Sequence, residues 1–138
     1  ISIHSDIQSF GNRRHWVSGF GNYKSNMNGG LMFAKDVYEA LKYGQANAIF
    51  WDNVSGQFDI SIVGNEVNPY LMNVSATTSG IRFSKSGFVF SALAKHIKKG
   101  ARRIYVSDDS PTAVKYLAFE VPSKRQLVWY IVNTDTLQ

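Results

Sequence analysis

The 138-residue chain is long enough for one domain with a hydrophobic core, and its 44% hydrophobic and 18% charged residues are typical of a globular protein rather than a disordered one. Its formal net charge of +5 comes from basic residues that are spread along the sequence, which is not typical of a nucleic-acid-binding protein. Cysteine is absent and no run of eighteen apolar residues occurs, which excludes disulfides, thiolate chemistry and a membrane-spanning helix.

The first 28 residues contain two different patterns. Residues 1–6 (ISIHSD) alternate apolar and polar side chains, which is typical of the end of a strand. Residues 7–28 are rich in Gly, Asn and Ser and are predicted to form a long loop, in which Trp16 either lines a binding cleft or pins the loop down. Because the chain does not begin with methionine, we expect it to be part of a longer polypeptide.

Residues 29–51 predict a helix followed by a buried strand. In residues 29–44, apolar side chains recur at helical spacing opposite charged ones, and Gly44 stands where a C-terminal cap belongs. Residues 46–51 (ANAIFW) are too short and too apolar for a surface strand. A helix, a tight turn and a buried strand are half of a repeating βα unit, which favours an α/β fold.

The rest of the chain predicts small strands, a second helix and a hairpin. Residues 57–63 and 70–84 are strand-like. Residues from 86 onward form a second amphipathic helix, which Gly100 is expected to end. Residues 113–135 read as two antiparallel strands that are joined at 122–125, because Leu127, Trp129 and Ile131 alternate with other side chains.

Three segments together resemble glycoside hydrolase family 30. Residues 34–53 (AKDVYEALKYGQANAIFWDN) are similar to the last helix and eighth strand of such a (β/α)8 barrel, and residues 86–107 (SGFVFSALAKHIKKGARRIYVS) to the run that follows. Residues 116–135 (YLAFEVPSKRQLVWYIVNTD) are similar to paired strands of the accompanying sandwich. The resemblance implies the C-terminal part of a (β/α)8 barrel in residues 1–103 that leads into the first strands of an antiparallel β-sandwich in residues 104–138.

The resemblance also implies roles for individual residues. Trp51 corresponds to the strand-eight tryptophan that lies under the sugar in the cleaved subsite. The nucleophile is a glutamate at the end of strand seven, which is expected immediately ahead of Ile1, and the acid/base glutamate belongs to strand four, also upstream. No catalytic residue is therefore assigned within the chain, although retaining hydrolysis needs two carboxyl groups about 5 Å apart.

Several polar residues are candidates for contacts with a glycan. Asp52 and Asn53 follow Trp51 directly and can hydrogen-bond sugar hydroxyls, and His4 is expected close to the nucleophile position. Asn53-Val54-Ser55 and Asn73-Val74-Ser75 are acceptor sequences for N-glycosylation, and a glycan on Asn53 would exclude its role in binding. The expected location is accordingly extracellular or secreted.

Two hypotheses of different class follow. In the first, the chain is the C-terminal segment of a retaining glycoside hydrolase that acts on a polysaccharide or glycoconjugate, inactive alone and completed by the remainder of its barrel as an upstream or companion chain. In the second, it is a non-catalytic carbohydrate-binding or structural component of an extracellular assembly. Neither hypothesis requires a cofactor or a metal, since the three histidines share no ligand spacing.

Overall fold

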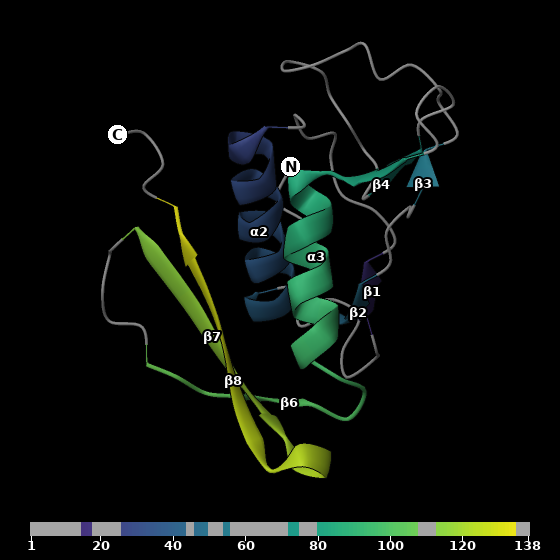
Figure 1. The fold of residues 1–138 in the computed structure, drawn as a ribbon. Coiled ribbons are helices and arrows are strands. Elements are labelled where there is room, and N and C mark those ends of the chain that lie inside the picture. Colours follow the sequence, from purple (N-terminus) through teal and green to yellow (C-terminus); the bar gives the residue numbers. More distant parts are fainter. Residues whose placement is uncertain are drawn as a thin grey trace.

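The computed structural model shows an α/β arrangement in which two helices lie side by side between small sheets (Figure 1). The helices start at the same end of the molecule and run in the same direction. The structure describes residues 15–17, 26–43, 46–49, 54–55, 72–74, 80–107 and 113–134.

The first unit is strand β1 (His15–Val17), helix α2 (Met27–Lys42) and strand β2 (Ala46–Ile49). The two strands pair in parallel, with Trp16 opposite Ala48. Two parallel neighbours joined by a helix form a βαβ unit. The prediction of a loop over residues 7–28 is therefore wrong for β1 and for the start of α2, because β1 is a three-residue strand within a polar segment and its pairing partner is distant in sequence.

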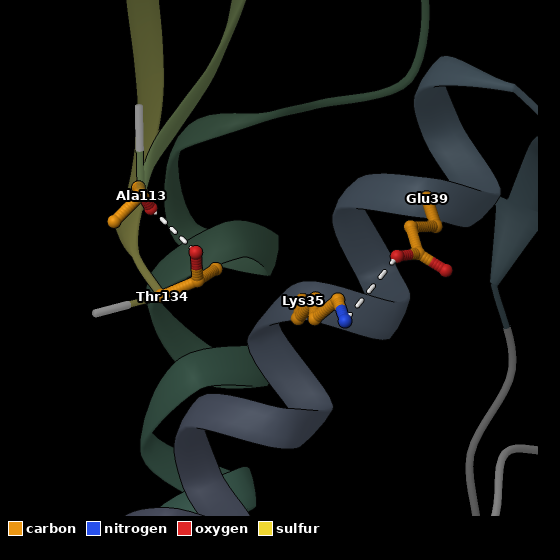
Figure 2. A network of polar contacts seen from close by, with 4 residues as sticks. All are labelled: Lys35, Glu39, Ala113 and Thr134. Carbon is orange, nitrogen blue, oxygen red and sulfur yellow. Dashed lines mark hydrogen bonds and ion pairs between the residues drawn. The ribbon is translucent and has the colours of Figure 1, made fainter. Parts of the chain in front are cut away.

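Helix α2 confirms the helix that was predicted over residues 29–44. Asn26 caps it, since its side-chain oxygen accepts a hydrogen bond from the Gly29 amide at 3.1 Å. On the polar face, the Lys35 ammonium lies 3.8 Å from the Glu39 carboxylate, an exposed pair of small energetic weight (Figure 2). The opposite face of α2 is buried and carries Phe33, Ala34, Val37 and Tyr38.

The middle of the chain contributes a three-stranded sheet of β3 (Val54–Ser55), β4 (Met72–Val74) and β5 (Ile81–Phe83). Strands β3 and β4 are parallel, whereas β4 and β5 are antiparallel. The two later strands confirm the strand-like pattern predicted within residues 70–84. The strand predicted over residues 57–63 lies outside the described residues.

Helix α3 (Lys85–His96) begins with Ser84 as its cap, whose hydroxyl accepts from the Gly87 amide at 2.9 Å. It ends four residues before the predicted stop at Gly100, because Ile97 leaves the helix with an extended backbone and packs against the buried Tyr38 cluster. Gly100 instead occupies the turn that follows, with φ of +87°. Neither described helix combines the length and the apolar character that crossing a bilayer requires.

The C-terminal sheet consists of β6 (Arg102–Ile104), β7 (Val114–Val121) and β8 (Gln126–Asn133), all antiparallel, with the short 3-10 helix η1 (Pro122–Lys124) at the hairpin turn. This confirms the hairpin predicted over residues 113–135 and its turn at 122–125. At the open end of the hairpin, the Thr134 amide and hydroxyl both donate to the Ala113 carbonyl, at 2.7 and 2.5 Å (Figure 2).

The core lies on both sides of α2. One cluster joins Phe33 and Val37 to α3, and the other joins Tyr38 to the inner face of β7. The Tyr130 hydroxyl of β8 donates to the Ala34 carbonyl of α2 at 2.8 Å, and its burial raises the pKa of this phenol above its usual range. Residues on either side of the predicted boundary at 103/104 thus share one core.

The outer face of the C-terminal sheet remains apolar and open. Leu127, Trp129 and Ile131 are 63%, 53% and 61% exposed. Since side chains alternate along β8, Val128, Tyr130 and Val132 face the core while these three point away from it. The described residues form an α/β unit; the closed barrel and the second layer of a sandwich remain predictions.

Candidate functional site

The candidate site lies at the end of the molecule where β1 and β2 finish. Only residues 43–45 separate the last residue of α2 from the start of β2, so α2 must run opposite to both strands and begin near their carboxyl ends. In α/β folds, this edge is where ligands bind and where catalytic groups stand. Strand β2 ends at Ile49, two positions before Trp51 in the sequence.

A close approach holds the two helix starts together at this end. A Cβ placed on Gly30 of α2 would lie 2.7 Å from the Cβ of Lys85 at the start of α3, which is closer than two such atoms can approach. Only glycine permits this spacing at position 30. The caps Asn26 and Ser84 fix both helix starts, so the end of the molecule that carries the candidate site is built on two rigid elements.

The structure places two of the predicted contact and modification residues within strands. Trp16 lies in the middle of β1, paired with β2, rather than in the loop in which it was expected. Asn73 lies in β4 opposite Arg82. His4, Trp51, Asp52 and Asn53 lie outside the described residues, so their roles remain predictions.

The position of the nucleophile implied by the family resemblance stays a prediction, because residues 1–6 lie outside the described residues. That glutamate was expected ahead of Ile1, on the assumption that residues 1–6 are the strand before α2. Among the described residues, the strand that precedes α2 and pairs with β2 is β1. The sequence from 18 to 35 contains no Asp or Glu, and the next carboxylate, Asp36, belongs to α2. The sequence therefore supplies no carboxylate between β1 and Asp36.

The other titratable groups of the described residues do not gather at this end. Glu39 pairs with Lys35 on the surface of α2, Glu120 is exposed in β7, and His96 is exposed in the last turn of α3. Among the described residues, no three His, Asp or Glu side chains are grouped so that they could hold a metal ion.

Arg103 makes a long-range contact with the end of α2 that the sequence alone did not predict. Lys98, which follows α3, donates to the Ala94 carbonyl of its own helix at 2.7 Å. Arg103 acts on the other helix: its guanidinium donates to the Leu41 carbonyl and, at 2.7 Å, to the Lys42 carbonyl of α2. The Arg102-Arg103 pair just after Gly100 was the available signal, but the partner of Arg103 is about sixty residues away in sequence.

Comparisons with known proteins give similarity of fold. No protein-family model and no curated protein matches the sequence. Among solved structures, the catalytic domain of GH30 xylanase C from Talaromyces cellulolyticus matches 81% of this chain with a TM-score of 0.62 at 19% identity. SrfJ from Salmonella typhimurium matches 96% of it with a TM-score of 0.73 at 18% identity. The chain spans only 26% and 31% of these two proteins, so it resembles part of a larger domain.

Proposed function

We propose that this chain is the C-terminal segment of a carbohydrate-active domain of the family 30 type, with β1 and β2 as strands seven and eight of a (β/α)8 barrel. The observation that carries the proposal is the parallel β1-α2-β2 unit, followed by α3, whose second strand ends two residues before Trp51. The similarity to part of a GH30 xylanase domain supports the same placement. Trp51 then stands at the sugar-binding edge, with Asp52, His4 and Trp16 as further contacts.

The open face of the C-terminal sheet supports the second half of this proposal. An apolar row formed by Leu127, Trp129 and Ile131 is what one sheet of a sandwich presents to the other. Further strands of the same polypeptide, together with the upstream part of the barrel, are the proposed partners. We also propose that the protein is secreted and carries glycans on Asn53 and Asn73.

The first prediction tests the role of Trp51. In the complete polypeptide that contains this chain, Trp51→Ala is expected to raise the Kd for xylohexaose or cellohexaose about tenfold or more, because the indole supplies a flat apolar surface to the sugar ring. Titration calorimetry measures the change. Tyr105→Ala is the matched control, since Tyr105 is 89% exposed at the end of β6 and should leave the Kd unchanged. Equal affinity of the Trp51 variant and the unmodified protein would contradict the proposal.

A second candidate function, binding without hydrolysis, is favoured by the lack of Asp or Glu between β1 and Asp36. If β1 is strand seven, the position of the nucleophile is occupied by residues from Ser18 onward, none of which is acidic before Asp36. A retaining hydrolase cannot form its glycosyl-enzyme intermediate without that group.

The second prediction separates the two candidates. The complete polypeptide is incubated with an activated 2-deoxy-2-fluoro-xyloside, which traps the covalent intermediate of retaining enzymes on the nucleophile. Intact-mass measurement is expected to find no adduct, while xylohexaose or cellohexaose binding is retained. An adduct that peptide sequencing places on a carboxylate upstream of this chain would establish the hydrolase and remove the non-catalytic alternative.

A further inference from the structure

Basic side chains gather at the end of the molecule opposite the candidate site. Figure 1 shows that α2, α3 and the β7–β8 hairpin all reach this end, and that β6 crosses beneath the helices. The hydrogen bonds from Arg103 to the last turn of α2 confirm that β6 lies against this helix end. The basic residues of these segments, here called the basic end, are Lys42, Lys95, Lys98, Lys99, Arg102, Arg103, Lys124 and Arg125.

Acidic groups do not balance this charge among the described residues. Asp36 and Glu39 belong to the body of α2, where Glu39 is engaged by Lys35. Glu120 of β7 lies in register with Arg102 and is the one described carboxylate on the strands of the basic end. A surface with this excess of positive charge attracts polyanions.

Most of these cations are available to a partner. Lys98 and Arg103 already serve helix carbonyls, and Lys42 lies over the Tyr38 and Tyr43 rings. The others are exposed residues that come from three separate elements: Lys95, Lys99, Arg102, Lys124 and Arg125.

The hairpin turn adds an observation that is independent of charge. Arg125 adopts a left-handed backbone with φ of 51° and ψ of 44°, and its amide donates to the Pro122 carbonyl at 3.2 Å. Glycine or asparagine suits this conformation better, so an arginine here is held at a cost in backbone strain. The conformation closes the turn between β7 and β8 and leaves Arg125 exposed beside Lys124.

We propose that the basic end binds an acidic polysaccharide, one that carries carboxylate or sulfate groups. Cations drawn from a helix end, a strand and a hairpin turn fit an extended polymer better than a single anion. Single-stranded nucleic acids also require aromatic rings for base stacking. Two exposed rings belong to the segments of this end: Tyr43, which contacts Lys42 and the edge of Tyr38, and Tyr105, which follows β6. The choice of a glycan over other polyanions rests on the proposed function.

The location of this surface gives it a role distinct from the sugar-binding edge. The basic end lies where the helices finish, whereas β1 and β2 point toward the end where the helices start. One protein can therefore hold an acidic polymer at one end while a neutral sugar chain occupies the other.

The experiment measures binding of the complete polypeptide to polygalacturonate and to heparin between 50 and 200 mM salt. Lys99→Glu/Lys124→Glu is expected to raise the Kd about tenfold and to flatten its dependence on salt, because fewer counterions are released. Lys35→Glu/Lys85→Glu changes the net charge equally on the surface of α2 and at the start of α3, away from the basic end, and is expected to leave the Kd near that of the unmodified protein.

Three outcomes would overturn the inference: no binding at 50 mM salt, equal weakening by both double variants, or tighter binding to duplex DNA or phosphatidylserine vesicles than to either polysaccharide. The Trp51 experiment is read separately with neutral oligosaccharides. Suppose that Trp51→Ala leaves xylohexaose and cellohexaose binding unchanged while Lys99→Glu/Lys124→Glu still weakens polygalacturonate binding. That result would contradict the proposed function and support polysaccharide binding at the basic end.

Discussion

Replacing Phe33 with alanine is expected to lower the free energy of unfolding by about 3–5 kcal/mol, a large fraction of the stability of an ordinary domain. Phe33 is 0% exposed and its ring lies 6.5 Å, centroid to centroid, from the ring of Phe90 on α3. Removing it leaves a cavity at the contact between the two helices. Urea denaturation of the complete polypeptide, followed by circular dichroism, measures the loss.

Met32→Ala is the matched control for Phe33→Ala. Met32 is the preceding residue of the same helix but is 60% exposed, so its truncation is expected to change the free energy of unfolding by no more than about 0.5 kcal/mol. If both variants lose the same amount, or if Phe33→Ala loses less than about 1 kcal/mol, the packing of α2 against α3 is not as described.

Gly30→Val is expected to destabilise the protein by about 1–3 kcal/mol through overpacking rather than through a cavity. A Cβ at position 30 would lie 2.7 Å from the Cβ of Lys85 and 3.3 Å from its carbonyl carbon, so α2 and α3 must move apart at their starts. Because this contact supports the end that carries the candidate site, the variant is also expected to weaken binding of xylohexaose or cellohexaose.

Asn28→Val introduces the same side chain two residues earlier, at an exposed position of the same helix turn. It reproduces the small cost of a β-branched residue in a helix without the clash, so the difference between the two variants isolates the contact with Lys85. Equal unfolding midpoints for Asn28→Val and Gly30→Val would show that the helix starts are not in contact.

Local patterns predicted the elements that depend on local physics. The helical spacing of Ala34, Val37 and Tyr38 predicted α2 and its buried face, and both are confirmed. The alternation through Leu127, Trp129 and Ile131 predicted the antiparallel hairpin. Helix α3 ends earlier than predicted. Packing of Ile97 against Tyr38 overrides the helical preference of the residues before Gly100.

The site was less accessible to sequence reasoning than the helices. Strand β1 has three residues, and its pairing with β2 joins segments about thirty residues apart, so no local pattern signals it. The nucleophile that the family resemblance implies ahead of Ile1 stays a prediction, because residues 1–6 lie outside the described residues.

The sequence by itself determined the α/β class, the two amphipathic helices and the C-terminal hairpin, because spacing of apolar side chains and turn residues acts over a few positions. Tertiary structure alone decided that β1 is the parallel neighbour of β2, that Gly30 lies against Lys85, and that Arg103 closes the end of α2. Each of these contacts joins residues about thirty to sixty positions apart, and such distant partners are selected by packing and backbone pairing in the folded chain.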